Sequence, residues 1–278
     1  MTEQLLYRLP WQSPAVYPGA HTGQTVGAGP LFKRHGSLLA HPDPRRIDVR
    51  ASVLNPFGDY QVRLYQRQSN ITVWVIADLS ASMGYADKPE ILRQFVQTSA
   101  DSAFAYGDKF GFIGCGDHFE QRWFVTASQQ PATVTELCQQ LAQHRFSGSA
   151  KHLAQAAQYL PSQRAMVFLL TDCHYPLPQL RSVLATLQGH DVIPLVLWHP
   201  DDYTRLPQWG LLALQDLESQ HSRLLLMRPS LRPKLQTAYW QRHLALKNSF
   251  RAMGSEPLFM TGPYSTPTIN HFLQQRAA

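Results

Sequence analysis

An apolar run that stops at an acidic residue is the feature that most limits how this chain can fold. Residues 71–77 read ITVWVIA, and Asp78 follows directly. A run this apolar and this rich in β-branched side chains is typical of a strand that is buried on both faces, as in a parallel sheet. The sequence therefore predicts a central strand here, with Asp78 at its carboxyl end.

The rest of the chain alternates short apolar runs with segments of helical spacing. Further strands are predicted at residues 110–115, 120–125, 165–170, 191–198 and 257–260, and helices from about 88 onward and at 133–144, 152–160, 177–187, 232–253 and 267–275. The tight Gly116-Asp117 turn between the second and third strands predicts one antiparallel edge strand. The alternation as a whole predicts an α/β fold with a doubly wound, mostly parallel sheet.

Two segments fall outside this alternation. In residues 1–68, frequent proline and glycine break any long helix, so we expect an N-terminal extension of irregular loops and a few strands laid over the main domain. The main domain is expected to take residues 69–278. Within it, the pattern at about 205–229 predicts a β-hairpin insertion.

Composition narrows the class of protein. The chain has 278 residues, of which 44% are hydrophobic, enough for one large domain with a sizeable core. Three widely spaced cysteines, Cys115, Cys138 and Cys173, fit neither a disulfide framework nor a zinc site and favour a reducing compartment. No run approaches the ~20 apolar residues of a membrane span, and the first residues do not read as a signal peptide. We therefore expect a cytoplasmic protein.

The formal charge of +6 raises the question of nucleic acid as a partner. The basic residues are scattered along the chain, and no recognition motif accompanies them. A basic nucleic-acid-binding adaptor is therefore a minor alternative.

Polar residues gather directly after two of the predicted strands. Asp78, Ser80 and Ser82 place an acid and two hydroxyls at alternate positions after the first strand. Asp172 follows another buried strand, directly after Thr171. Ligands of a doubly wound sheet bind beyond the carboxyl ends of strands where the strand order reverses, and hard cations such as Mg²⁺ prefer oxygen ligands. If the two strands are neighbours, the sequence predicts a cation site between the two acids.

These motifs resemble the von Willebrand factor A domain, whose metal-ion-dependent adhesion site uses D-x-S-x-S, then a Thr, then an Asp after the fourth strand. The resemblance spans about residues 71–260 and implies that Rossmann-like fold. Gly27-Ala28-Gly29 with Phe32, and Arg45-Arg46-Ile47-Asp48, resemble the bacterial MoxR-associated branch, domain-of-unknown-function family fifty-eight. Val49 replaces the Trp that usually ends the second of these motifs, and residues 41–43 read His-Pro-Asp where Gly-Asp-Asp is usual.

The third loop of the site departs from the family pattern. The family's Thr lies in G-G-T-x-L, whereas residues 147–153 here read SGSAKHL. Alignment on Gly148 offers the Ser149 hydroxyl as a ligand and is slightly favoured. Alignment on Leu153 offers Lys151, whose ammonium would replace the metal between the two carboxylates. His174, two residues after Asp172, is more typical of a surface loop.

The resemblance implies a site in which Mg²⁺, Mn²⁺ or Ca²⁺ is present or in which Lys151 stands in its place. The implied metal ligands are Asp78, Ser80, Ser82, Ser149 and Asp172. It also implies a non-enzymatic, chaperone-like adaptor that binds a MoxR-type AAA+ ATPase and a client protein, with an acidic partner side chain completing the metal's coordination. An alternative is a Mg²⁺-dependent phosphoryl hydrolase that uses Asp78, although the phosphate-binding lysine and downstream acids of such enzymes are not clear. Ser80 and Ser82 lack a nearby His-plus-acid grouping, which disfavours a hydrolase triad.

Overall fold

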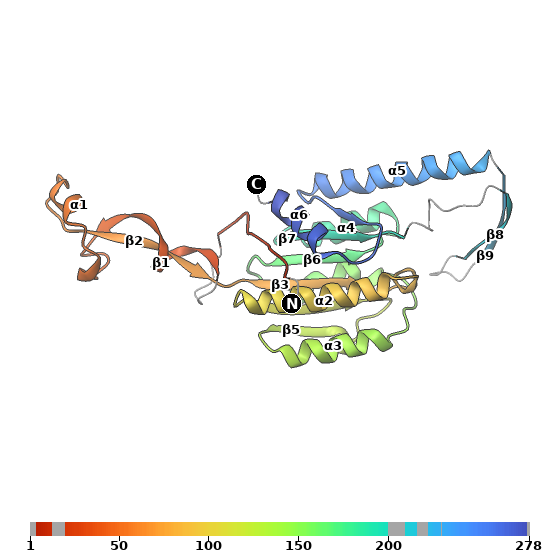
Figure 1. Ribbon diagram of the computed structural model, residues 1–278, viewed down its shortest axis with the longest axis horizontal. Coiled ribbons are helices and arrows are strands. Elements are labelled where there is room, and N and C mark those ends of the chain that lie inside the picture. Colours follow the sequence, from red (N-terminus) through yellow and green to blue (C-terminus); the bar gives the residue numbers. More distant parts are fainter. Residues whose placement is uncertain (1–3, 13–19, 200–208, 216–221, 229, 277–278) are drawn as a thin grey trace. The chain divides into compact units, whose positions relative to one another are not determined.

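The computed structural model describes residues 4–12, 20–199, 209–215, 222–228 and 230–276 (Figure 1). The chain divides into two compact units. The larger comprises Met1–Tyr7, Thr72–Ala105 and Lys109–Ala278, and the smaller Arg8–Ile71 and Tyr106–Asp108. The start of the chain thus belongs with the larger unit. Leu5 is buried there, and its backbone N–H donates to Ser102 Oγ at 2.8 Å.

The larger unit is built on a six-stranded sheet in the order β10-β7-β6-β3-β4-β5. Its strands are β3 (Thr72–Asp78), β4 (Lys109–Cys115), β5 (Phe124–Ser128), β6 (Met166–Thr171), β7 (Asp191–Leu197) and β10 (Leu258–Met260). All neighbours are parallel except β4 and β5, which are antiparallel. The predicted α/β fold, a mostly parallel sheet with one antiparallel edge strand, is confirmed.

Helices pack on this sheet (Figure 1). They are α2 (Lys88–Ala105), α3 (Pro131–Gln143), α4 (Leu177–Thr186), α5 (Leu231–Ala252) and α6 (Thr266–Arg276), with 3₁₀ helices η2 (Ala81–Gly84), η3 (Gln121–Trp123) and η4 (Lys151–Tyr159). The helix expected at residues 152–160 therefore forms as a 3₁₀ helix. None of the helices in the described part of the chain combines the length and apolar character needed to cross a bilayer.

The core has two layers because successive side chains of a strand point to opposite faces. Trp74 and Ile76 of β3 join one buried cluster with residues of η4, α4 and α5. On the opposite face, the ring of Phe168 in β6 lies 5.1 Å from that of Phe95 in α2. With both faces covered, the continuous apolar run of β3 is explained.

The smaller unit contains a long antiparallel ribbon. Strands β1 (His21–Ser37) and β2 (Gln61–Ser69) pair along their lengths, and η1 (Pro44–Arg46) and α1 (Val49–Val53) connect them. The extension is thus more regular than the loops we expected. Three register shifts interrupt the pairing, and such irregularities break the two-residue alternation by which strands are recognised in a sequence.

A second pair of strands forms the predicted hairpin insertion. Strands β8 (Gly210–Gln215) and β9 (Ser222–Met227) are antiparallel and make a sheet of their own. Residues 205–208, 216–221 and 229 of the predicted insertion lie outside the described residues.

Candidate functional site

The sheet brings Asp78 and Asp172 to the same edge. Strands β3 and β6 are parallel neighbours with Ala77 opposite Leu170, so both end at this edge. Asp78 is the last residue of β3, and Asp172 directly follows β6. The strand order reverses between these two strands, which is where doubly wound sheets bind ligands. Both acids are nevertheless fully buried.

Hydrogen bonds hold the Asp78 carboxylate in place. Its Oδ1 accepts the backbone N–H of Ser80 at 2.9 Å, and its Oδ2 accepts the Thr171 hydroxyl at 2.8 Å. The Ser80 and Ser82 hydroxyl oxygens lie 3.2 Å apart, and both serines are buried. The D-x-S-x-S loop is therefore held against Asp78 through the Ser80 backbone N–H.

A lysine closes this group. Lys88, the first residue of α2, is only 2% exposed. Its Nζ donates to Asp172 Oδ2 at 3.0 Å and to the Ser82 carbonyl oxygen at 3.2 Å. A buried charge needs such an ion pair and hydrogen bonds, because removal from water is costly otherwise. We call Asp78, Ser80, Ser82, Lys88 and Asp172 the acid–lysine cluster.

The two acids have opposite electrostatic environments. Burial, followed by the neighbouring charge of Asp172, raises the pKa of Asp78 to about 6. Burial acts to raise the pKa of Asp172 as well, but His174 and Lys88 beside it hold that pKa well below its usual range. His174 Nδ1 lies 3.1 Å from Asp172 Oδ2. Asp172 is therefore the carboxylate that pairs with cations, whereas Asp78 is held by neutral donors.

Among the described residues, neither Ser149 nor Lys151 makes a hydrogen bond or ion pair with Asp78 or Asp172, and their roles in the site stay predictions. Ser149 donates its hydroxyl to Asp117 Oδ1 at 2.6 Å and its backbone N–H to the same oxygen at 3.0 Å. Gly148 before it has φ of +71°, which directs the third loop toward Asp117. Lys151 is exposed at the start of η4. The third loop is thus bound to the turn after β4 through Ser149, and also to the D-x-S-x-S loop, because the Gly148 carbonyl oxygen accepts the Ala81 backbone N–H at 3.0 Å.

Lys88 was not recognised from the sequence as a site residue. The sequence placed Lys88 at the start of the helix that was expected from about residue 88 onward. A cation in the first turn faces the positive end of the helix dipole, which disfavours it. That unfavourable position was the available signal that Lys88 has a specific carboxylate partner.

The donor set of the cluster does not fit a divalent cation. Mg²⁺, Mn²⁺ and Ca²⁺ favour shells of oxygen ligands, whereas here an ammonium lies 3.0 Å from Asp172. The third-loop hydroxyl that would complete a metal shell is bound to Asp117. Among the residues that the structure describes, no three His, Cys, Asp or Glu side chains gather in a way that would hold a metal.

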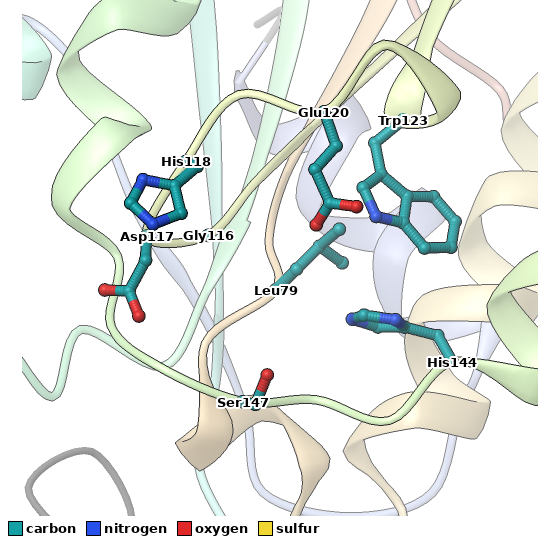
Figure 2. Close-up of a pocket in the computed structure, with 8 residues that line it drawn as sticks. All are labelled: Leu79, Gly116, Asp117, His118, Glu120, Trp123, His144 and Ser147. Carbon is teal, nitrogen blue, oxygen red and sulfur yellow. The ribbon is translucent and has the colours of Figure 1, made fainter.

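A cavity of about 150 Å³ opens beside the cluster. Figure 2 shows its lining residues: Leu79, Gly116, Asp117, His118, Glu120, Trp123, His144 and Ser147. Leu79 belongs to the D-x-S-x-S loop, so the cavity lies at the carboxyl ends of β3 and β4. Trp123 is buried, and its indole Nε1 has no hydrogen-bond partner among the described residues. Glu120 also lines the cavity. The cavity therefore offers the Trp123 indole N–H as a hydrogen-bond donor and the Glu120 carboxylate as an acceptor to a small polar group.

Comparison with models of protein families shows which family the chain belongs to. The family model described as "Protein of unknown function DUF58" matches residues 43–244, more than half of the chain. The chain belongs to this family. No curated protein matches this DUF58 protein.

Several solved structures have a similar arrangement of elements. Conserved hypothetical protein BatB from Bacteroides thetaiotaomicron matches with a TM-score of 0.45 and 12% identity, over 74% of this DUF58 chain and 97% of BatB. An aerotolerance-related membrane protein from Bacteroides fragilis NCTC 9343 matches with 0.45 and 14%, over 75% and 98%. The SpRpn10 VWA domain matches with 0.41 and 12%, over 74% and 95%. Likenesses this distant carry no functional argument.

Proposed function

We propose that this DUF58 protein is a non-enzymatic adaptor that binds a MoxR-type AAA+ ATPase and a client protein. The observation that carries the proposal is a group of large apolar side chains exposed between β1 and β2, which we call the tip patch. Its members are Leu39, Val49, Val53, Leu54, Phe57 and Tyr60, each between 64% and 88% exposed. Exposed apolar patches mark surfaces that bind other molecules.

The tip patch lies at one end of the ribbon of the smaller unit. The backbone N–H of Leu38 donates to the Tyr60 carbonyl oxygen at 2.8 Å, which holds Leu39 and Tyr60 close together. The remaining members belong to α1 and the turn that follows it, at the same end of the ribbon (Figure 1). The six exposed residues therefore all belong to the segment that connects β1 and β2, at the same end of the ribbon.

The charges around the tip patch favour a protein over a membrane. Residues 39–60 contain three arginines and three aspartates. Some of these pair with each other, for example Arg46 Nε with Asp43 Oδ2 at 3.0 Å. Segments that bind anionic lipid surfaces carry an excess of basic residues, whereas a polar rim around apolar residues is typical of protein interfaces.

The acid–lysine cluster favours binding over catalysis. A phosphoryl hydrolase that used Asp78 would need this carboxylate to reach its substrate. Asp78 is fully buried, and each of its oxygens already accepts a hydrogen bond. Ser80 and Ser82 are buried beside it. These contacts support an adaptor rather than a hydrolase.

Changing the tip patch should weaken binding of the ATPase. In the double variant Leu54→Ser/Phe57→Ser, we expect the Kd for a purified MoxR-type AAA+ ATPase from the same organism to rise at least about tenfold, because large apolar anchors dominate interface energies. The free energy of unfolding should stay close to that of the wild type, since both side chains are exposed. Biolayer interferometry gives the Kd, and urea unfolding gives the stability.

A matched control uses another exposed leucine. Leu244 lies on α5 and is exposed, so Leu244→Ser removes a similar side chain outside the tip patch and should leave the Kd unchanged. Unchanged ATPase binding by the tip variant would contradict the proposed surface. Binding of the wild type to anionic vesicles, lost in the tip variant, would identify a membrane partner instead.

A further inference from the structure

We infer that Lys88 is a built-in cation, whose ammonium takes the position that a divalent metal holds in metal-ion-dependent adhesion sites. The acid–lysine cluster is then complete without a metal. This assignment goes beyond the adaptor function and does not depend on it, because it concerns only the contacts of buried side chains in the larger unit.

The position of the Lys88 ammonium matches that of a bridging cation. Lys88 Nζ lies between the two loops that supply ligands in such sites. It donates to the Ser82 carbonyl oxygen of the D-x-S-x-S loop and to Asp172 Oδ2 of the loop after β6. One cationic group therefore joins both loops, which is the role of the metal in the resembled domain.

The acid–lysine cluster contains two carboxylates, whose negative charge needs compensation. Asp78 and Asp172 are both buried, and they lie at the ends of two neighbouring parallel strands. Two neighbouring carboxylates in a protein interior need a compensating positive charge. Lys88 supplies that charge from within the chain. A divalent ion added beside it would be repelled by the ammonium.

The backbone around residue 88 holds Lys88 in this position. Its backbone N–H donates to the Tyr85 carbonyl oxygen at 3.3 Å, and α2 begins at this residue. Ala86, two residues earlier, adopts a left-handed conformation with φ of 55°, a conformation that non-glycine residues keep only when their surroundings impose it. To admit a metal, the ammonium would have to leave a position that is only 2% exposed.

A consequence concerns how the site can meet a partner. A metal-ion-dependent adhesion site leaves one coordination position open for an acidic side chain of the partner. Here the ammonium is enclosed, and Ser82 and Asp172 already accept from it. The cluster therefore joins η2, α2 and the loop after β6 through buried hydrogen bonds.

The test measures Mn²⁺ binding to the full chain by electron paramagnetic resonance of free Mn²⁺, together with thermal unfolding at increasing Mn²⁺. We expect no saturable binding by the wild type and no change of its Tm. In Lys88→Ser, removal of the ammonium should leave an oxygen-rich site that binds one equivalent of Mn²⁺ saturably, and Mn²⁺ should then raise the Tm of this variant. The added change Asp172→Asn should abolish that gain.

Two results would overturn the assignment. One is saturable binding of one Mn²⁺ by the wild type that is lost in Asp78→Asn. The other is a folded Lys88→Ser variant that binds no Mn²⁺, because the ammonium would then not hold the cation position.

A second measurement covers the case in which Lys88→Ser does not fold. Amine acetylation of the wild type, followed by mass spectrometry, should leave Lys88 unmodified while the exposed Lys151 reacts. Protection of Lys88 should be the same with and without Mn²⁺. Faster acetylation of Lys88 on addition of Mn²⁺ would mean that the metal displaces the ammonium, and the assignment would fail.

Discussion

Replacing Lys88 by methionine should lower the free energy of unfolding by about 3–5 kcal/mol. Methionine has a similar length but no charge, so Asp172 would stay buried without its lysine partner. Breaking a buried ion pair on one side is among the most destabilising single changes, because the remaining charge is left uncompensated. Urea unfolding followed by circular dichroism measures the change.

Two further variants make this measurement specific. Lys151→Met removes an exposed lysine and should change the free energy of unfolding by no more than about 0.5 kcal/mol. In the double variant Lys88→Met/Asp172→Leu, the loss should be smaller than the sum of the two single losses, because no unpaired carboxylate remains at position 172. A Lys88→Met protein as stable as the wild type would show that the ion pair contributes little.

Replacing Gly148 by alanine should lower the free energy of unfolding by about 2–4 kcal/mol. The new Cβ would lie 1.8 Å from Asp117 Oδ2, and the residue would keep a left-handed φ of +71°. Asp117 would have to move, and its two hydrogen bonds with Ser149 would be lost. The third loop would then separate from the turn after β4.

Another glycine provides the control for this prediction. Gly189 lies in a turn where an added Cβ meets no described atom within 4 Å, so Gly189→Ala should change the stability by no more than about 0.5 kcal/mol. The double variant Gly148→Ala/Asp117→Ala should remove the clash, but it still lacks the two hydrogen bonds between Asp117 and Ser149, so its loss relative to Asp117→Ala alone reports the backbone strain. If Gly148→Ala alone matched the Gly189→Ala control, the third loop would not depend on this close approach.

The sheet could be predicted because a short stretch of sequence is enough to identify each of its buried strands. The apolar, β-branched run of residues 71–77 identifies a strand covered on both faces, and an acid after such a strand lies at its carboxyl end. A second run ending at Thr171 and Asp172 repeats the pattern. Once the strands are parallel neighbours, the meeting of Asp78 and Asp172 follows from topology alone. The fold and these two acids were therefore available from the order of the residues.

The sequence was less informative about which apolar side chains are exposed. The apolar residues of the segment 39–60 have no period that separates a covered face from an exposed one. In the structure these residues form the tip patch. Exposure depends on which neighbours cover a side chain, and bulged strands such as β1 obscure that information in the sequence.

The cation of the site depended on loop conformation. Spacing and family pattern pointed either to a divalent metal with Ser149 among its ligands or to the Lys151 ammonium in its place. The observed cation, Lys88, comes from the start of α2, where the left-handed conformation of Ala86 precedes it. Sequence order thus established the strands and the two carboxylates, because hydrophobic patterning and parallel pairing place them. The choice of counter-ion required the folded loops, because backbone angles and hydrogen bonds far apart in the chain direct those side chains.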